Sequence, residues 1–216
     1  MRMALLPVKD PKQAKHRLTP MLSAEQRERL VRAMFEEVLV QLMAVKGLDR
    51  VVVASSDPET LLLAAAAKAT PLKEQEQLGH SHAADQATQQ LMKWGATSLL
   101  LVPVDVPLVK AAEMEELLVA AKGLVAPSLV IVPNAEGSGT NAMVRTPPDL
   151  ISSRFGPNSL PQHLEQARAA KATVLVLHPK GLVHDMDTPE EARDLLTRGW
   201  GGRSAGLFRK FLSRHA

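Results

Sequence analysis

The sequence contains no cysteine and no tyrosine, and aromatic residues account for only 3% of its 216 residues. Without cysteine, the chain can form neither disulfide bonds nor thiolate metal sites, and a cysteine nucleophile is excluded. So few aromatic rings leave little material for stacking against nucleic-acid bases, the usual way of binding single strands. Because a reducing compartment suits such a chain, we expect a cytoplasmic protein that binds no nucleic acid.

The sequence also lacks a long apolar run and a strong excess of charge. The apolar stretch within residues 1–8 is too short for a signal peptide or a membrane span. The 26 basic and 23 acidic residues leave a formal net charge of only +3, which does not by itself indicate a nucleic-acid partner. The length and the 45% content of hydrophobic residues are sufficient for a globular domain with a sizeable core.

Apolar runs typical of buried strands alternate with segments of helical periodicity. We expect strands at 4–8, 51–54, 99–102, 128–132 and 173–177, with a further short strand at 142–144. We expect helices at 23–42, 58–69, 83–94, 111–122 and 162–170, and a last one after Thr188. Because this alternation implies βαβ crossovers, the pattern predicts a single α/β domain over residues 1–198, with a mostly parallel sheet and helices on both faces.

Three of these helices have local signals at their starts. Ser23 stands three residues before Gln26, which is the spacing of a capping box. Asp57 is followed by Pro58, an N-cap residue with proline at the first helical position. Thr188 is followed by proline and two glutamates, which is also typical of a helix start.

Residues 199–216 differ in character from the rest of the chain. Three glycines fall within four positions, and Leu207, Phe208, Phe211 and Leu212 then follow among basic residues. This pattern predicts a basic amphipathic C-terminal tail on a flexible joint. It would pack on its own domain or on a twin subunit in a homodimer; attachment to a membrane surface is the alternative.

Two acidic clusters follow predicted strands. Asp105 lies three residues after the strand at 99–102, and Asp185 and Asp187 lie a few residues beyond the strand at 173–177. In an open α/β sheet, ligands bind outside the carboxyl ends of the strands. Three carboxylates there could hold Mg²⁺, which prefers oxygen ligands and phosphates. The alternative is that Asp105 caps a helix and Asp187 lies at the start of one.

The loop after the first strand is rich in cations. Lys9, Lys12, Lys15 and Arg17 fall within nine positions, and a nucleoside triphosphate needs several such groups to offset its charge. The alternative is a solvated basic loop. The sequence has no Walker A motif and no G-x-G-x-x-G, so neither a P-loop nor a dinucleotide fingerprint is present.

Two glycine-containing turns have the composition of anion sites. The first, at 136–141, would offer backbone N–H groups to an anion. The second, at 154–159, leads into a helix whose N-terminus would attract a phosphate. If these are more than ordinary turns, the second substrate also carries phosphate.

Six motifs occur together in a specific order. They are Pro7-Val8-Lys9, Lys15-His16-Arg17-Leu18, Pro103-Val104-Asp105-Val106-Pro107-Leu108, Gly137-Ser138-Gly139-Thr140-Asn141, Arg154-Phe155-Gly156-Pro157-Asn158-Ser159 and Asp185-Met186-Asp187-Thr188-Pro189. Through them, residues 4–195 resemble the 2-phospho-L-lactate guanylyltransferase family of coenzyme F-420 biosynthesis. That family includes phosphoenolpyruvate and 3-phosphoglycerate guanylyltransferases.

The resemblance implies a Rossmann-like nucleotidyltransferase of the nucleotide-diphospho-sugar transferase type. It implies transfer of GMP from GTP to 2-phospho-L-lactate, phosphoenolpyruvate or 3-phosphoglycerate, with release of pyrophosphate, and a product that passes to the next enzyme of the pathway. The implied residues are Asp105, Asp185 and Asp187 for Mg²⁺; Lys9, Lys15, Arg17, Gly79 and Ser81 for GTP; Thr140, Gly156 and Ser159 for the acceptor; and Lys9, Lys15, Arg17 and Asp105 for catalysis.

The chain departs from the family pattern at three places. A frequent Asp-Leu-Pro is Asp105-Val106-Pro107 here, a frequent Gly-Leu-Asn is Gly79-His80-Ser81, and a usual small residue is Asn158. The last two bear on guanine selectivity and on the acceptor. Two alternatives therefore stay open, namely a nucleotidyltransferase of the same fold that acts on a molybdopterin or sugar phosphate, and a non-catalytic nucleotide-binding domain.

Overall fold

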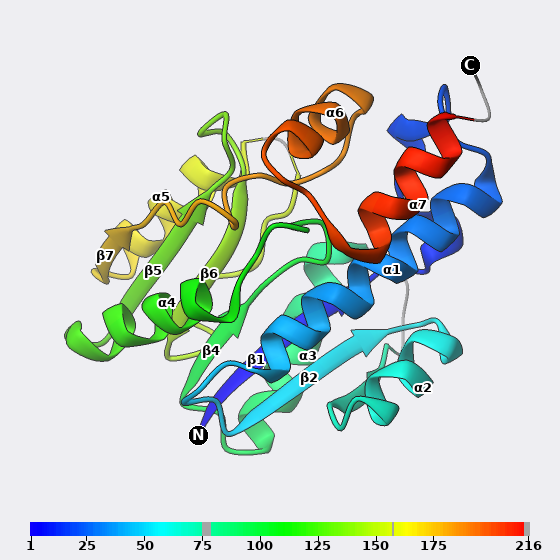
Figure 1. Ribbon diagram of the computed structural model, residues 1–216. Coiled ribbons are helices and arrows are strands. Elements are labelled where there is room, and N and C mark those ends of the chain that lie inside the picture. The colour runs from blue at the N-terminus through cyan, green and yellow to red at the C-terminus, as the bar shows by residue number, and fades with distance from the viewer. Residues whose placement is uncertain (75–78, 157, 214–216) are drawn as a thin grey trace.

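The computed structural model describes residues 1–74, 79–156 and 158–213; Pro157 of the second turn and residues 214–216 of the tail lie outside this range. A seven-stranded sheet with helices on both faces forms the domain (Figure 1). The strands are β1 Arg2–Val8, β2 Arg50–Ser55, β3 Thr70–Lys73, β4 Ser98–Leu101, β5 Ser128–Pro133, β6 Thr140–Thr146 and β7 Thr173–Val176. The α-helices are α1 Ala24–Met43, α2 Pro58–Ala66, α3 His80–Lys93, α4 Ala111–Gly123, α5 Ser159–Ala169, α6 Pro189–Thr197 and α7 Gly202–Leu212.

The predicted capping signals are confirmed. Ser23 and Gln26 form a reciprocal capping box at α1, and Thr188 forms one with Glu191 at α6. The carboxylate of Asp57 accepts a hydrogen bond from the backbone N–H of Thr60 at the start of α2. These helix starts depend on contacts within four residues, which is why the sequence was sufficient to locate them.

The end of α2 and the strand after it were wrongly predicted. The helix ends at Ala66 rather than 69, because Lys68 adopts a left-handed conformation (φ 66°) and the N–H of Ala69 bonds back to the carbonyl of Ala64 at 3.0 Å. Strand β3 then follows and was not predicted. It contains Pro71, which a strand tolerates at the edge of a sheet, and its half-exposed side chains give no apolar run.

Two helices start earlier than predicted, and one strand is longer. Helix α5 starts at Ser159, directly after Asn158 in the left-handed conformation (φ 57°), and α3 starts at His80. Asparagine tolerates this conformation better than most residues. Strand β6 covers Thr140–Thr146 instead of 142–144.

The strand order explains where the site lies. The order is β3-β2-β1-β4-β6-β5-β7, and β6 runs antiparallel to both of its neighbours while the other pairings are parallel. The order reverses between β1 and β4, so a crevice opens outside their carboxyl ends. Because β6 is antiparallel, its first residue, Thr140, pairs with Pro133 at the end of β5 and lies at this same edge.

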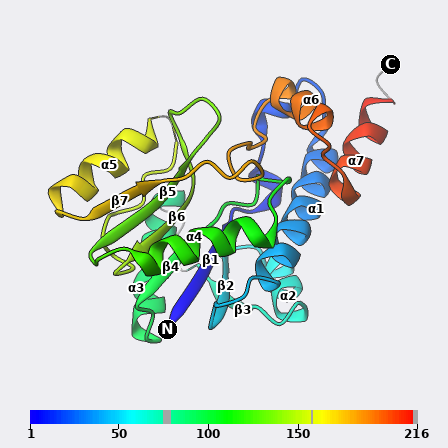
Figure 2. The same ribbon diagram turned by 60° about the vertical axis from the view of Figure 1, so that its left-hand side comes forward.

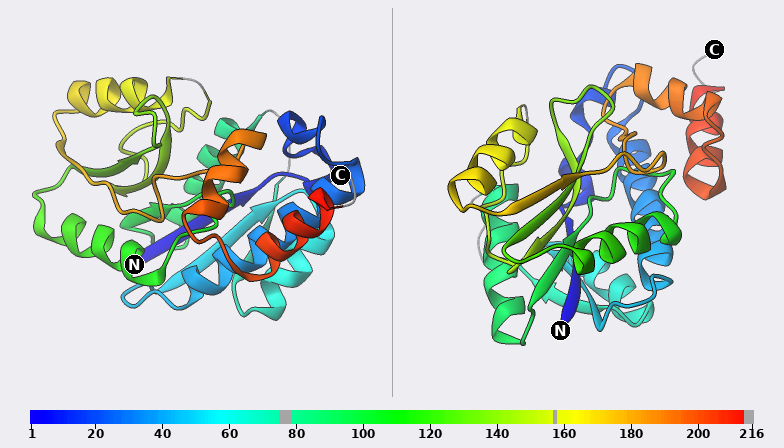
Figure 3. Two further views of the ribbon diagram at one scale, coloured as in Figure 1. Left: turned by 45° about the horizontal axis from the view of Figure 1, so that its top comes forward. Right: turned by 90° about the vertical axis from the view of Figure 1, so that its left-hand side faces the viewer.

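The strands are buried on both faces, as expected for a sheet covered by helices. Alternate residues such as Leu6 and Val8 pack with α1 and α4, whereas Leu5 and Leu101 pack with α3 and α5. Figure 3 shows these two helical layers on opposite sides of the sheet. The prediction of a mostly parallel sheet with helices on both faces is confirmed.

The helix of the C-terminal tail packs against α1 (Figures 1 and 2). Phe208 and Phe211 are buried in a third apolar cluster with Trp200, Leu30 and Met34. The packing on its own domain, one of the three placements that the sequence left open, is therefore observed. The division of the chain at residue 198 stays a prediction. No helix among the described residues is long and apolar enough to cross a membrane.

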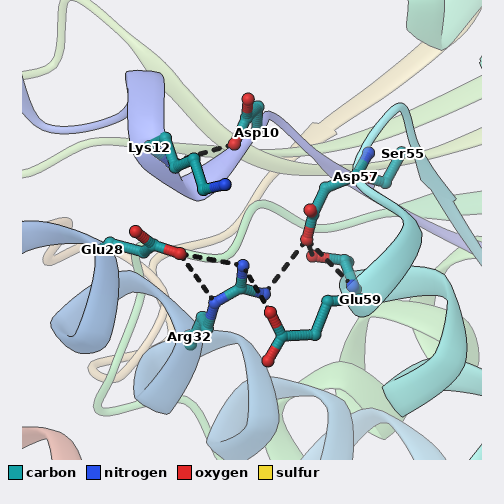
Figure 4. A network of polar contacts seen from close by, with 8 residues as sticks. Asp10, Lys12, Glu28, Arg32, Ser55, Asp57 and Glu59 are labelled. Carbon is teal, nitrogen blue, oxygen red and sulfur yellow. Dashed lines mark hydrogen bonds and ion pairs between the residues drawn. The ribbon is translucent and has the colours of Figure 1, made fainter. Parts of the chain in front are cut away.

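A network of charges joins α1 to α2 (Figure 4). The guanidinium of Arg32 lies 3.0 Å from Asp57 Oδ2, 3.0 Å from Glu28 Oε1 and 2.9 Å from Glu59 Oε2. Burial alone would raise the pKa of Asp57, but the hydrogen bonds from Thr60 and Arg32 outweigh it and lower that pKa below its usual value. The carboxylate that caps α2 is thus also the one that ties α2 to α1.

We predict that Asp57→Ala lowers the free energy of unfolding by about 2 kcal/mol near pH 7, because it removes both the cap and the ion pair. The pKa of Asp57 is lower in the folded chain than in the unfolded chain, so its contribution is present above about pH 4 and is lost as the pH falls through the folded-state pKa. Urea unfolding at pH 7 and pH 3 should show the penalty shrinking in acid.

The matched control is Glu59→Ala. The Glu59 side chain is 61% exposed and contacts the same guanidinium, so its loss should cost less than about 0.5 kcal/mol. An Asp57→Ala penalty that is equal at both pH values would contradict the role given to the ionised carboxylate.

Candidate active site

A cavity of about 810 Å³ lies outside the carboxyl ends of β1 and β4. Ten of the predicted site residues line it, namely Lys9, Lys15, Arg17, Ser81, Asp105, Thr140, Gly156, Ser159, Asp185 and Asp187. Gly79, with φ 99°, precedes α3 and is not among the lining residues that the structure describes. The fold therefore brings segments from both halves of the chain to the crevice that the strand order predicts.

Lys15 connects the two acidic clusters. Its Nζ atom lies 2.7 Å from Asp105 Oδ2 and 2.5 Å from Asp187 Oδ1, and its side chain is only 6% exposed. Burial would lower the pKa of Lys15, but the two carboxylates outweigh it and raise that pKa. The backbone of Lys15 is left-handed (φ 56°), an uncommon conformation for a residue other than glycine, asparagine or aspartate. The ammonium group is therefore charged and held by both aspartates.

The segment that carries Asp185 and Asp187 is fixed by backbone and side-chain bonds. The N–H of Met186 donates to the carbonyl of Asp105 at 2.9 Å. Met186 stands between the two aspartates in the sequence, and its side chain is buried in the core. Asn141 Nδ2 lies 3.3 Å from Asp185 Oδ1, and the N–H of Asp187 donates to Glu191 Oε2 at 2.7 Å. The two aspartates line the same cavity.

These two aspartates lie in opposite electrostatic environments. Burial and the nearby charge of Asp105 raise the pKa of Asp185 to about 6. Burial would also raise the pKa of Asp187, but the positive charges of Lys15, Arg17 and Lys9 outweigh it and lower that pKa. Negative charge is thus uncompensated around Asp185 and compensated around Asp187.

The three aspartates offer only oxygen ligands, which is the chemistry that Mg²⁺ prefers. Within the described residues, however, no group of three or more His, Asp or Glu side chains is arranged to hold a metal ion. The ammonium of Lys15 lies between Asp105 and Asp187, where a cation held by both carboxylates would lie. The donor set fits Mg²⁺ only if Lys15 moves away, and the metal role of the three aspartates stays a prediction.

The first glycine turn does not form the anion nest that its composition suggested. Asn134 Oδ1 accepts the N–H groups of Ser138 and Gly139 at 3.0 and 2.8 Å, and the carbonyl of Asn134 accepts the N–H of Gly137 at 3.0 Å. The backbone donors are thus used within the turn, and the expectation of a nest there was wrong. Asn134 was missed because it lies at the end of β5, outside the glycine-rich motif.

The N-terminus of α5 is also largely occupied. The N–H of Leu160 donates to the carbonyl of Ser138 at 3.2 Å, and Pro161 has no N–H to offer. On this wall of the cavity the groups able to donate are hydroxyls. Ser81 Oγ accepts the N–H of Phe155, and Ser159 Oγ accepts the N–H of Thr140, both at 2.9 Å. Each hydroxyl can still donate its own hydrogen.

A histidine that the sequence reading missed lies behind these hydroxyls. His163 is fully buried, and its Nδ1 atom lies 3.0 Å from Thr140 Oγ1. The only available signal was its position four residues after Ser159, which places both on one face of α5. The sequence analysis assigned no histidine to the site.

The comparisons with known proteins agree with this geometry. The family model described as "Guanylyl transferase CofC like" matches residues 1–213. A phosphoenolpyruvate guanylyltransferase of Rubrobacter xylanophilus is 36% identical over 91% of this chain and 94% of that protein. A 2-phospho-L-lactate guanylyltransferase of Methanothermobacter thermautotrophicus is 32% identical over 96% and 89%, respectively. A 3-phospho-D-glycerate guanylyltransferase of Colwellia psychrerythraea is 30% identical over 87% of each chain.

A solved structure confirms the predicted fold type. A chain from Desulfovibrio desulfuricans G20, described as a nucleotide-diphospho-sugar transferase, superposes with a TM-score of 0.78 at 17% identity, covering 99% of this chain and 97% of that chain. At this identity the likeness shows the fold alone. From the family match over nearly its whole length, the chain belongs to the CofC-like guanylyl transferase family and is a nucleotidyltransferase.

Proposed function

We propose that this guanylyltransferase transfers GMP from GTP to a small phosphorylated carboxylic acid, with Mg²⁺ as its metal ion. The acceptor is 2-phospho-L-lactate, phosphoenolpyruvate or 3-phosphoglycerate, the three acids for which the relatives are named. The observation that carries the proposal is the composition of one cavity. It combines the cations after β1, the carboxylates after β4 and β7, and the hydroxyls of β6 and α5.

We assign the cationic loop to the nucleotide. Lys9 and Arg17 are exposed at the cavity and close enough to Asp187 to lower its pKa, so they would meet the phosphates of GTP. Gly79 and Ser81 would lie toward the base. Asp105, Asp185 and Asp187 would hold Mg²⁺, which when bound would offset the negative charge of the phosphates. Lys15 would then exchange its carboxylate partners for phosphate oxygens.

We assign the opposite wall to the acceptor. The hydroxyls of Thr140 and Ser159 would donate to its phosphate or carboxylate oxygens. Gly156 has φ 116° and open space where a side chain would be, so its backbone can approach a ligand closely. Asn158, directly before α5, takes the left-handed conformation that asparagine tolerates.

In the proposed reaction, an oxygen of the acceptor phosphate attacks the α-phosphorus of GTP. A new oxygen–phosphorus bond forms, the bond from the α-phosphorus to the bridging oxygen breaks, and pyrophosphate leaves with the bonding electrons. A phosphate monoester has a second pKa of about 6 and is largely dianionic at neutral pH, so no general base is needed. The protein's task is to orient two polyanions in line and to offset their repulsion.

The family further favours a role in coenzyme F-420 biosynthesis, with the product taken up by the next enzyme of that pathway. The absence of cysteine suits a reducing compartment, and a cytoplasmic location stays part of the proposal. A homodimer stays part of it as well, although the apolar face of α7 is used within the chain.

The first test is pyrophosphate release. The purified protein, with Mg²⁺, is mixed with each of the four nucleoside triphosphates and each of the three acids; GTP alone and each acid alone are the controls. We expect release with GTP and predominantly with one acid. No release with any pair, from protein shown by circular dichroism to be folded, would contradict the proposal.

We predict that Asp105→Asn lowers kcat/KM by at least about a hundredfold, because it removes a carboxylate proposed to hold Mg²⁺ and a partner of Lys15. Asp194→Asn is the matched control, because Asp194 is half exposed, pairs with Arg198 and does not line the main cavity. Steady-state kinetics should show near-normal turnover in that control. An Asp105→Asn enzyme within a few-fold of the wild type would contradict the assignment.

A further inference from the structure

The hydrogen bonds of His163 determine which of its ring nitrogens carries a proton. The backbone N–H of Arg154 donates to Nε2 at 2.9 Å. A backbone N–H can only donate, so Nε2 must accept and carries no proton. The ring is neutral near pH 7, because burial and the positive charges of Arg145 and Arg154 lower the pKa of His163 to about 4. The single ring proton must therefore be on Nδ1.

This tautomer in turn determines the role of the Thr140 hydroxyl. Because Nδ1 carries the proton, the contact of 3.0 Å is one in which His163 donates and Thr140 Oγ1 accepts. The hydroxyl hydrogen of Thr140 therefore points elsewhere, and no acceptor for it is present among the described residues. Thr140 lines the cavity, and its backbone N–H is already used by Ser159 Oγ.

The same reasoning applies one residue further along the wall. Ser159 Oγ accepts the N–H of Thr140 at 2.9 Å, which leaves the hydroxyl hydrogen of Ser159 available as well. The backbone donors of the adjoining turn are used by Asn134. The cavity wall thus presents two hydroxyl hydrogens, and a ligand able to satisfy them must bring oxygen acceptors.

We propose that His163 is a positioning residue that holds the Thr140 hydroxyl as a hydrogen-bond donor toward an anionic oxygen of the acceptor. The identity of that ligand rests on the proposed function. The positions of the protons on His163 and Thr140 follow from the hydrogen bonds alone and do not rest on it. His163 does not touch the acceptor itself. If the Thr140 hydroxyl donated its hydrogen to His163, it would present only lone pairs to the cavity, and these would repel an anion. The proton on Nδ1 of His163 excludes that orientation.

A purely structural role for His163 is the competing explanation, because its Nε2 bond also holds the turn at Arg154. Two variants separate the bonds. His163→Asn keeps an amide donor near the position of Nδ1, and His163→Gln keeps an amide oxygen near the position of Nε2. If the histidine only holds the turn, His163→Gln should be the milder change; if it orients Thr140, His163→Asn should be.

The experiment combines kinetics with NMR of the wild type. We expect His163→Gln to raise the KM for the acceptor on the order of tenfold, with kcat and the KM for GTP much less affected, and His163→Asn to raise it less. In a Thr140→Val background, His163→Gln should add little. Additive effects in that double variant, or an unchanged acceptor KM in His163→Gln, would overturn the inference.

The NMR arm does not depend on activity or on a variant that folds poorly. Nitrogen-15 shifts of the imidazole rings in the full chain should show a His163 that is neutral at pH 7 with its proton on Nδ1. A proton on Nε2 would overturn the inference. If the wild type releases no pyrophosphate with any acid, the proposed function fails, while the tautomer still tests the arrangement of donors.

Thr88→Val is the control for loss of stability. Thr88 is a buried residue of α3. Its hydroxyl accepts a hydrogen bond from Arg145 Nη2 at 2.9 Å, and it does not line the cavity. We expect it to lower the melting temperature without raising the acceptor KM. An equal rise in KM in Thr88→Val would mean that destabilisation alone explains the His163 variants, and would overturn the inference.

Discussion

The site depends on one buried cation that lies between two carboxylates. Lys15 belongs to the loop after β1, Asp105 follows β4 and Asp187 lies beyond β7, so one ammonium group joins three segments that are far apart in sequence. A buried charge is tolerated only when it is paired, and removing one partner leaves the others uncompensated. The carboxylates are therefore held together by Lys15. Under the proposed function, Mg²⁺ and nucleotide would bind by taking over these ionic partners of Lys15 and of the two aspartates.

The opposite wall of the cavity works through neutral groups. Asn134 accepts the N–H groups of Gly137, Ser138 and Gly139, and the carbonyl of Ser138 accepts the N–H of Leu160 in α5. These backbone donors are therefore not offered to the cavity, and the wall presents hydroxyl hydrogens there. A hydroxyl can rotate, whereas an amide N–H cannot, so its direction has to be set by a further contact. The hydrogen bond from the buried His163 supplies that contact at Thr140. Charge on one side and oriented neutral donors on the other would hold two polyanions without leaving unpaired charge in the wall.

The sequence predicted those features that depend on neighbours in the chain or on strand order. The starts of α1, α2 and α6 follow from caps within four residues, and the crevice follows from strand ends at which charged residues cluster. It could not predict the Lys15 pairing, because its partners are 90 and 172 residues away. Asn134 and His163 were missed for a similar reason, since each acts on a motif from outside it. Strand β3 was missed because an edge strand needs no apolar run.

The exchange at Lys15 can be measured directly by titrating Mg²⁺ into the nucleotide-free protein and following the heat of binding. We predict that Lys15→Met, which keeps the length of the side chain but removes its charge, binds Mg²⁺ at least about tenfold more tightly than the wild type, because nothing competes for the two carboxylates. Arg17→Met should change the affinity less, since Arg17 does not lie between them. Equal or weaker Mg²⁺ binding by Lys15→Met would contradict the view that Lys15 occupies the cation position.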